Sequence, residues 1–440
     1  MSQRTVLRAV ALLGALSVVL AGCGGGNVTA PGAQGPASGG PSARKCEPVL
    51  AKASGQPSPV PLKIGTLMPE TGSLALLGPP EIAAVDVAVK EINAAGGVLG
   101  NPVTVVRGDS GDVTTDTASQ TVDRELSQGV QAIIGAASSS VTKLVMSKIT
   151  GAGVVEFSPA NTSDELTCFP EKRGLYFRTA PPDVLQAQAL AKLMTDEGAQ
   201  RISILARNDT YGGGLATNTV NNLRDAGIPQ NQIQKIVYDP NATSYNTEIE
   251  DVRQFNPDAI VVIGFDESKK IVTRMSEVQI GPGQKMLYGT DGNMGSTLSE
   301  GLPPGLLNGM KGTAPRSRLT PEFQQRLKAD NPKLMDFTYA GEAYDAVVIT
   351  ALAAERAKST KGVDIASEII GITRDGEKCT TFRQCRDIID GGGNPAYVGV
   401  TGALNFTAAG ERATGSYGVL KFNAQNKIDE AAIQYRTVGG

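Results

Sequence analysis

The feature that most constrains the fold is a repeated alternation of short apolar segments with helical segments that carry an apolar stripe. Residues 132–134 and 154–157 are short and apolar, and a helical pattern separates them. The apolar stripe of that helix consists of Val141, Leu144, Val145 and Ile149. Buried strands that alternate with amphipathic helices are typical of a parallel sheet covered on both faces. The sequence therefore predicts an α/β fold.

The same alternation runs through two series of the chain. The first series starts with a strand at 62–68 and ends with a strand at 175–178, which Pro181 and Pro182 follow. The second series begins directly after the two prolines and runs to residue 288. Two such series indicate two lobes, each built like a Rossmann fold around a parallel sheet. We expect the first crossing between the lobes at the prolines.

Hydroxyl side chains follow both strands of the opening stretch. Ser138 and Ser139 come after the strand at 132–134, and Thr162 follows the strand at 154–157. In parallel sheets, ligands bind just beyond the carboxyl ends of the strands. The serines also begin a helix, whose unpaired N–H groups favour an anion. The pattern predicts a cradle for a small carboxylate, although Ser and Thr are also ordinary helix caps.

Several segments, taken in order, carry a family resemblance. The segments GAASSSVTK (135–143) and FSPANTSDEL (157–166) resemble the leucine/isoleucine/valine-binding group of type I periplasmic binding proteins, the substrate receptors of ABC importers. The resemblance covers roughly residues 62–421. Further matches are Ile64-Gly65 with Thr71-Gly72, EINAAGG (91–97), FRT (177–179), DTYGGG (209–214) and GTDG (289–292).

The resemblance implies a set of ligand-binding residues for an amino acid. It assigns the ligand carboxylate to Ser138, Ser139 and Thr162, and the ligand ammonium to the Ala160 carbonyl and to Asp291. A zwitterion needs donors at one end and acceptors at the other, and hydrogen bonds to charged groups are the strong ones. The alternative for Asp291 is a turn residue beside Gly292.

The remaining residues that the resemblance assigns would line the ligand's side chain. Tyr211 would be an aromatic lip from the second lobe, or else a surface tyrosine that opens a helix. Phe265 and Leu76 or Leu77 would line the side-chain pocket. Many relatives place an aromatic residue near Leu76, so branched-chain specificity stays open.

The resemblance also implies how the chain returns between the lobes. Residues 60–181 with about 310–415 would form lobe 1, and residues 182–309 with about 416–440 would form lobe 2. That arrangement gives three crossings and hence a hinge. Asp183, the first polar residue after Pro182, is expected to cap the following helix.

The N-terminus carries export signals. Arg4 and Arg8 precede an apolar run at 9–22, which is short for a membrane span and typical of a signal peptide. It ends in the sequence LAGC, similar to a bacterial lipobox, which implies removal of residues 1–22 and a lipid on Cys23. The alternative is an ordinary signal peptide. Residues 23–59 are predicted to be a flexible tether, because Gly, Pro, Ala and Ser dominate its first half.

Composition excludes several classes of function. The chain has no histidine, which removes Ser-His-Asp catalysis and histidine-bound zinc. The formal net charge is −3, with no basic block that would indicate a nucleic-acid partner. No G-x-S-x-G motif supports a hydrolase. We expect neither an enzyme nor a cofactor or metal site.

Four cysteines remain besides Cys23. They are Cys46, Cys168, Cys379 and Cys385, and an exported chain can oxidise them. Four cysteines allow three pairings. We favour Cys379–Cys385, which are close in sequence, and Cys46–Cys168, which would attach the end of the tether to the first lobe.

These observations predict a lipid-anchored, extracytoplasmic receptor that binds an amino acid, branched-chain or similar, between two lobes. The partners implied by the resemblance are an ABC permease and its ATPase in the membrane, and we expect the receptor to be a monomer. Closure follows because the ligand binds the closed state better. A sensory receptor of the same fold for amides, short-chain acids or aromatic acids is the alternative, and a surface adhesin with an empty cleft also stays open.

Overall fold

The computed structural model describes residues 46–334 and 336–439. The predicted signal peptide, the lipid site at Cys23 and the tether as far as residue 45 lie outside the described residues. In the part that is described, no helix combines the length and apolar character needed to cross a membrane.

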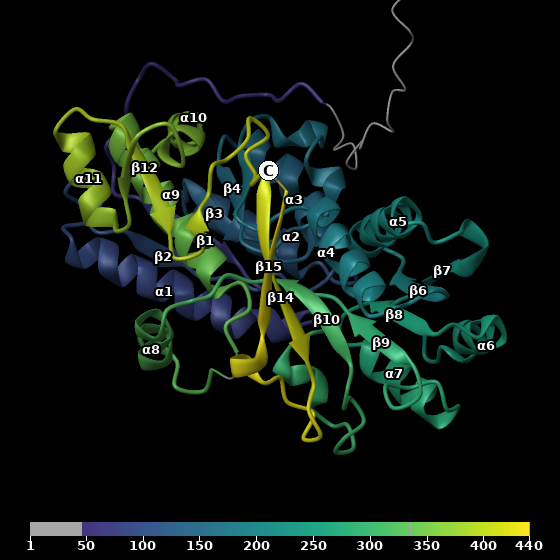
Figure 1. The fold of residues 1–440 in the computed structure, drawn as a ribbon. Coiled ribbons are helices and arrows are strands. Elements are labelled where there is room, and N and C mark those ends of the chain that lie inside the picture. The colour runs from purple at the N-terminus through teal and green to yellow at the C-terminus, as the bar shows by residue number, and fades with distance from the viewer. Residues whose placement is uncertain (1–45, 335, 440) are drawn as a thin grey trace, which may run out of the picture. The chain divides into compact units, whose positions relative to one another are not determined.

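The first sheet has five strands, all parallel, in the order β2-β1-β3-β4-β5 (Figure 1). Its elements follow the alternation predicted from the sequence. They are β1 (Lys63–Leu67), α1 (Gly78–Ala94), β2 (Thr104–Val106), α2 (Thr117–Ser127), β3 (Ala132–Gly135), α3 (Ser139–Gly151), β4 (Val155–Ser158) and β5 (Tyr176–Arg178). We call the part of the chain around this sheet lobe 1.

The second sheet has seven strands in the order β15-β14-β10-β9-β8-β6-β7. Strand β14 pairs antiparallel with both of its neighbours, β10 and β15, whereas all the other pairs in this sheet are parallel. Its elements are α4 (Asp183–Asp196), β6 (Ile202–Arg207), α5 (Thr210–Asp225), β7 (Ile233–Tyr238), α6 (Asn246–Phe255), β8 (Ala259–Ile263), α7 (Ser268–Glu277), β9 (Met286–Gly289), β10 (Lys311–Pro315), β14 (Thr414–Lys421) and β15 (Gln434–Gly439). We call the part around it lobe 2.

Between β10 and β14 the chain forms four helices and a small sheet of three strands. These elements are α8 (Pro321–Asp330), α9 (Ala340–Ala357), α10 (Gly362–Ile372), β11 (Glu377–Cys379), α11 (Phe382–Asp390), β12 (Pro395–Gly399) and β13 (Gly402–Ala403). Thr320-Pro321-Glu322 is a typical helix start, and the apolar stripe of residues 339–358 predicts a long helix, so the sequence indicates α8 and α9. The small sheet was not predicted, because its strands have only two to five residues.

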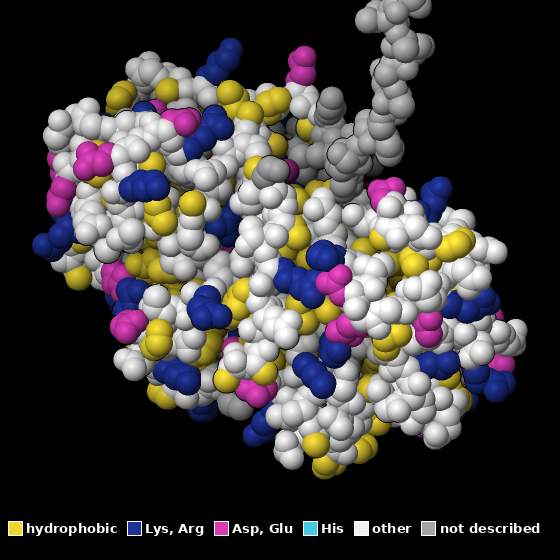
Figure 2. Space-filling model, viewed as in Figure 1, with side chains coloured by type: hydrophobic (Ala, Val, Ile, Leu, Met, Phe, Trp, Pro, Cys, Tyr) yellow, Lys and Arg dark blue, Asp and Glu magenta, His cyan; other side chains and the backbone are white. Residues whose placement is uncertain are grey.

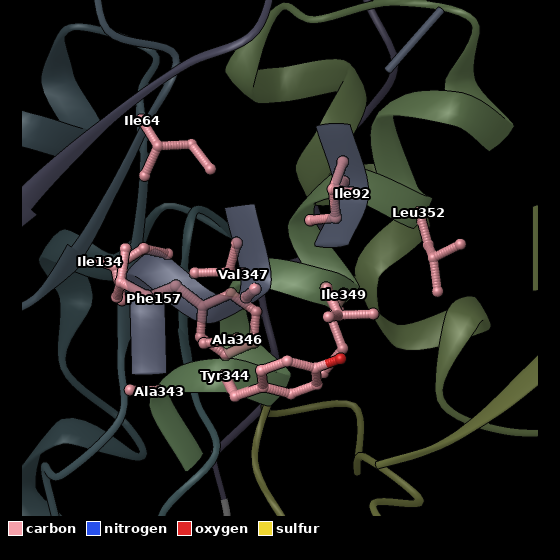
Figure 3. Packing of buried hydrophobic residues seen from close by; sticks show 14 of the residues in the cluster. Ile64, Ile92, Ile134, Phe157, Ala343, Tyr344, Ala346, Val347, Ile349 and Leu352 are labelled. Atoms are coloured by element: carbon pink, nitrogen blue, oxygen red, sulfur yellow. The ribbon is translucent and has the colours of Figure 1, made fainter. Parts of the chain in front are cut away.

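The core of lobe 1 forms where α1 and α9 cover the first sheet (Figure 3). Ile64 of β1, Ile134 of β3 and Phe157 of β4 belong to the same buried cluster as Ala343 and Val347 of α9, and β3 and β4 pack against α9. Almost every residue of α9 is buried, because α1, α10 and α11 pack around it. This long central helix returns the chain to lobe 1 after it has built most of lobe 2.

Three segments connect the lobes, as the resemblance implied. The first lies between β5 and α4, and the third lies just before β14. The second was expected at about residue 310. However, β10 pairs with both β9 and β14, so the chain leaves the second sheet only after Pro315. The boundary near 310 was therefore about five residues too early.

The N-terminal part of the described chain, residues 46–61, lies along lobe 1, and we call it the strap. Asp364 of α10 accepts hydrogen bonds from the backbone N–H (2.5 Å) and hydroxyl (3.0 Å) of Ser54. The Thr360 hydroxyl donates to the Ser58 carbonyl at 2.9 Å. The flexible tether expected up to residue 59 is thus wrong from residue 46 onward, because side chains of lobe 1 hold this segment.

The two disulfides are the favoured ones, Cys46–Cys168 and Cys379–Cys385. The first attaches the start of the strap to lobe 1, as predicted. On the face seen in Figure 2, basic and acidic side chains are interspersed, without a large area of one sign. This distribution agrees with the mixed charge of the sequence.

Candidate functional site

The predicted carboxylate cradle lies at the carboxyl ends of β3 and β4. Ser138 is the N-cap of α3, and its hydroxyl accepts from the Val141 N–H at 3.5 Å. The next two N–H groups, of Ser139 and Ser140, have no partner within the helix, as at every helix start. The structure therefore uses the Ser138 side chain as a cap and leaves backbone donors free.

Ser139 and Thr162 come together at this edge, and both are buried. The Ser139 hydroxyl accepts from the Ser163 N–H at 3.3 Å, which connects the two loops that follow β3 and β4. The Thr162 carbonyl accepts from the Asp183 N–H at 2.7 Å. This contact connects the loop after β4 to the first turn of α4. Ala160, assigned to the ammonium through its carbonyl, is also buried in this loop.

Asp291, just after β9, is held by three side-chain donors. Its Oδ1 accepts from the Tyr211 hydroxyl at 2.8 Å and from Gln186 Nε2 at 2.9 Å. Its Oδ2 accepts from the Tyr339 hydroxyl at 2.8 Å. Burial raises the pKa of Asp291, and the three donors oppose that shift. The backbone N–H of Asp291 itself also favours the ionised form.

Asp183 is a second buried carboxyl group in this region. It was expected to be a helix cap, but Pro182 is the N-cap and Asp183 lies in the first turn of α4. Among the described residues, neither of its carboxylate oxygens has a well-formed hydrogen bond. Burial raises its pKa, and the charges of Asp164 and Asp291 raise it further, while the Thr162 hydroxyl and Arg178 oppose them. Two buried carboxyl groups, Asp183 and Asp291, therefore lie close enough in this region to affect each other's charge.

Aromatic side chains form the other wall. Tyr211, in the first turn of α5, is buried rather than exposed, and its ring stacks on Phe265 with centroids 5.4 Å apart and planes at 21°. The Arg207 guanidinium lies over the Phe265 ring, with Cζ 3.6 Å from the ring centroid. Leu77 and Ala160 of lobe 1 belong to the same buried cluster as these rings, and Leu76 packs against it.

The two lobes meet around these residues. The Ser163 hydroxyl of lobe 1 donates to the Thr210 carbonyl of lobe 2 at 2.8 Å, and the Ser140 hydroxyl accepts from the Thr210 N–H at 3.1 Å. Tyr339, which precedes α9 in lobe 1, reaches Asp291 of lobe 2. The chain is thus in a closed arrangement, with the site residues buried between the lobes.

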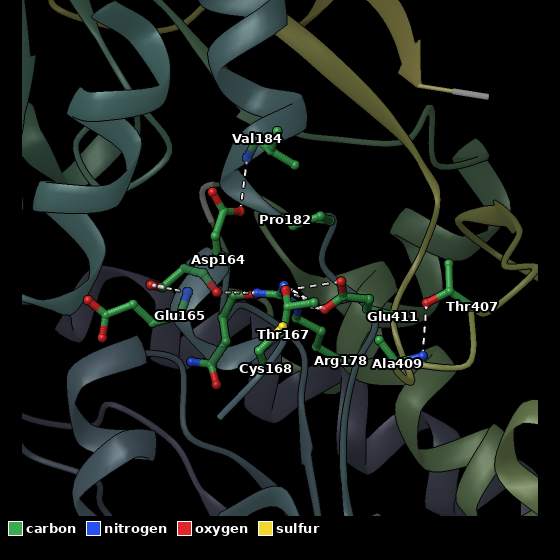
Figure 4. Close-up of polar contacts among 12 residues, drawn as sticks. Asp164, Glu165, Thr167, Cys168, Arg178, Pro182, Val184, Thr407, Ala409 and Glu411 are labelled. Carbon is green, nitrogen blue, oxygen red and sulfur yellow. Dashed lines mark hydrogen bonds and ion pairs between the residues drawn. The ribbon is translucent and has the colours of Figure 1, made fainter. Parts of the chain in front are cut away.

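A buried ion pair holds the loop after β4 beside the hinge (Figure 4). Arg178, at the end of β5, donates to Glu411 from Nε at 2.9 Å and from Nη2 at 2.6 Å. Its Nη1 donates to the Ser163 carbonyl at 2.8 Å. Arg178 precedes the first crossing and Glu411 precedes the third, so the pair connects two hinge segments to the loop that carries Thr162.

Of the residues predicted for the site, Leu77, Ala160, Tyr211 and Phe265 share one buried cluster, against which Leu76 packs, and the Ser139 hydroxyl contacts the residue after Thr162. The sequence missed Tyr339, Gln186 and the burial of Asp183. One feature of the sequence could have indicated that Asp183 and Gln186 belong to the site. Both lie at the start of α4, the helix that begins directly after the first crossing between the lobes. Over residues 46–334 and 336–439, no group of cysteine and acidic side chains is arranged to hold a metal ion.

Comparison with known families identifies the class of this protein. The family model described as "Periplasmic binding protein" matches residues 61–426. The chain therefore belongs to the type I periplasmic binding proteins of the leucine/isoleucine/valine-binding family. It is a substrate-binding protein of that family, whose members act outside the cytoplasm.

Individual relatives are distant. The chemotactic signal transduction system substrate-binding protein BasB of Halobacterium salinarum is 26% identical over 365 residues, which are 81% of this chain and 86% of BasB. The Leu/Ile/Val-binding protein homolog 8 of Brucella abortus is 31% identical over 212 residues, which are 46% of this chain and 51% of the relative.

Solved structures share the fold. The branched-chain amino acid transporter substrate-binding protein LivJ of Streptococcus pneumoniae, solved with isoleucine, has a TM-score of 0.68 at 24% identity and covers 86% of this chain and 100% of its own. The leucine-binding protein LivK of Thermotoga maritima has a TM-score of 0.69 at 21% identity and covers 86% and 99%. These similarities establish the fold.

Proposed function

We propose that this protein is the lipid-anchored substrate receptor of an ABC importer and that it binds a free amino acid between its two lobes. The observation that carries this proposal is the pairing of opposite chemistries in one buried site. Unpaired backbone donors lie at the start of α3, and two buried carboxyl groups lie at Asp291 and Asp183. A zwitterion has both complementary charges.

The ligand carboxylate would bind the N–H groups of Ser139 and Ser140 together with the Thr162 hydroxyl. The positive end of the α3 dipole adds to this attraction, because the first turn of a helix favours an anion. Ser139 would act through its backbone as well as by holding the loop at Ser163. Ser138 supports the site as the cap of α3.

The ligand ammonium would bind the Asp291 carboxylate and the Ala160 carbonyl, with Asp183 close to Thr162 and Asp291 as a further carboxyl group. An ammonium in this position would favour the ionised form of both carboxyl groups, which burial alone disfavours. The Tyr211–Phe265 stack, Leu76 and Leu77 would surround the ligand's side chain.

The test compares an amino acid with two analogues, each of which lacks one charge. Thermal unfolding is measured with L-leucine, with 4-methylpentanoate and with 3-methylbutylamine, after a screen of the other amino acids. At about 100 times the dissociation constant, a ligand stabilises the folded state by about 2.7 kcal/mol. For about 380 folded residues this corresponds to a rise in Tm of about 3 °C. We expect the rise only with a complete amino acid. An equal rise with the carboxylic acid analogue would contradict the proposal.

A chemosensory role is the second candidate, because BasB, which aligns with 81% of this chain, is named as part of a chemotactic system. The two roles share the binding site and differ in the membrane partner. Uptake of labelled ligand by cells that lack the gene separates them. A loss of uptake supports the importer, whereas normal uptake with lost chemotaxis supports the sensor.

A further inference from the structure

Lobe 1 contains a cavity of about 400 Å³ that is separate from the site between the lobes. It lies between the strap, the segment after Cys168, α10 and the residues just before Glu411. Cys46 and Cys168, which form the disulfide, are at one end. None of the residues assigned to the amino-acid site lines this cavity. Its volume is within the range of pockets that bind small molecules, about 300–1,000 Å³.

A lysine ammonium lies in the wall of this cavity. Lys172 Nζ donates to the Thr167 carbonyl at 3.1 Å and to the Ala409 carbonyl at 2.7 Å. An ammonium has three donors, so one donor is not used by these contacts. Burial lowers the pKa of Lys172 to about 8, with Glu411 opposing the shift and Arg178 adding to it. A partly buried cation that keeps an unused donor is favourably placed to bind an anion.

The remaining walls combine basic and apolar groups. Arg173 and Arg374 also line the cavity, and Glu47 is its one acidic side chain. The apolar lining includes Leu50 of the strap, Phe177 of β5 and Ile370 of α10. Arg173 pairs with Glu171 and Arg374 with Asp375, so Lys172 is the basic group of the lining with a donor to spare. One cation beside an apolar floor matches a ligand with one negative end and an apolar chain.

We propose that this cavity, the strap pocket, is a second binding site that takes a small carboxylate with an apolar chain, whose carboxylate pairs with Lys172. The occupant is distinct from an amino acid, because no acidic group lies in the pocket apart from Glu47, which is exposed on the strap. The pocket holds the carboxylate on Lys172 and the chain against Phe177 and Ile370.

The strap pocket borders the hinge. Thr167, Cys168 and Ala409 line it, and Figure 4 shows these residues beside the Arg178–Glu411 pair. The Thr167 hydroxyl contacts both oxygens of Glu411 at 3.1 Å. A ligand on Lys172 is therefore connected through Thr167 to Glu411, which lies just before the third segment between the lobes. It lies outside the amino-acid site itself.

Isothermal titration of the purified protein with octanoate tests the proposal, with 1-octanol as a neutral probe of the same length. We expect octanoate to bind, and 1-octanol to bind at least tenfold more weakly. Lys172→Met, which keeps the stem and removes the charge, should weaken octanoate binding at least tenfold. Octanoate affinity should also fall as pH is raised from about 7 to about 9, because Lys172 loses its proton near pH 8.

Two variants keep the result interpretable. Ala408→Trp adds a large side chain at an exposed position of the lining and should abolish octanoate binding without disturbing the core. Lys192→Met, which removes an exposed lysine of lobe 2, is the matched control and should leave binding unchanged. Octanoate binding that is the same in Lys172→Met and Ala408→Trp as in the unmodified protein would place the acid elsewhere and overturn the proposal. Equal affinity for 1-octanol, or no octanoate binding at all, would overturn it as well.

Discussion

Replacement of Asp291 by Asn tests the ammonium end of the site while it changes the shape of the side chain very little. The amide oxygen can keep the donors Tyr211 and Gln186, which both reach Oδ1. The amide nitrogen takes the place of Oδ2, and the Tyr339 hydroxyl can turn and accept from it. Asp291→Asn therefore retains the contacts within the protein and removes one buried charge.

The expected effects on ligand binding and on stability have opposite signs. A bound ammonium loses a hydrogen bond to a charged group and meets a donor in its place, which costs about 2–4 kcal/mol. The dissociation constant should rise by about 30-fold to 1,000-fold. Because burial already disfavours the ionised carboxyl group, the empty variant should be as stable as the unmodified protein or more stable.

Titration calorimetry with the amino acid that gives the largest thermal shift measures the affinity, and scanning calorimetry without ligand measures the stability. Glu156→Gln is the matched control, since Glu156 is a fully buried carboxyl group of β4 outside the site. Its replacement should leave the affinity unchanged. An affinity of Asp291→Asn within about threefold of the unmodified protein would refute the assignment of the ammonium to Asp291.

Three further predictions concern closure, pH and the small sheet. Tyr339→Phe removes a hydrogen bond between the lobes and should weaken ligand binding by about 1.5–3 kcal/mol. Tyr288→Phe is the control, because the Tyr288 hydroxyl contacts Glu197 within lobe 2, and it should leave binding unchanged. Equal affinities of the two variants in calorimetry would mean that Tyr339 does not support closure. Burial raises the pKa of Glu125 to about 8, so the folded protein holds a proton that the unfolded chain releases above about pH 4.3. Glu125 should therefore contribute a fall in the free energy of unfolding of up to about 1.4 kcal/mol per unit as pH rises from there to about 8, in addition to buried carboxyl groups such as Asp183 and Asp291. Glu125→Gln should reduce the slope in denaturant titrations by that amount, and an unchanged slope would contradict the prediction. Replacement of Cys379 and Cys385 by Ala opens a loop of sequence separation 6 and should lower the free energy of unfolding by about 2 kcal/mol; a variant of unchanged stability would show that the disulfide leaves the unfolded chain unaffected.

The fold could be predicted where apolar periodicity is strong. The strands of the first sheet, strands β6 to β9 of the second and the long helix α9 follow directly from that periodicity. Strand β10 was not predicted, and the last two strands were expected only from the family resemblance. The small sheet of lobe 1 could not be predicted, because a strand such as Glu377-Lys-Cys379 has no apolar pattern and is held by its neighbour β12 and by α11. The strap was missed for a similar reason, since polar contacts with Asp364 and Thr360, not apolar burial, hold it.

Sequence reasoning placed the site where local motifs recur and missed the parts that come from distant segments. Hydroxyls after two neighbouring strands predicted the positions of Ser139 and Thr162, because parallel strands bring their carboxyl ends to one edge. Tyr339 and Gln186 could not be found in this way. Each belongs to a different crossing of the hinge, and only the closed arrangement of the lobes brings them to Asp291.

The most direct test of the account is a crystal structure of the protein with its amino acid bound. The account predicts the ammonium about 3 Å from Asp291 Oδ2 and from the Ala160 carbonyl. The carboxylate should lie at a similar distance from the N–H groups of Ser139 and Ser140 and from the Thr162 hydroxyl. A ligand bound in the reverse orientation, or one bound outside the space between the lobes, would contradict it.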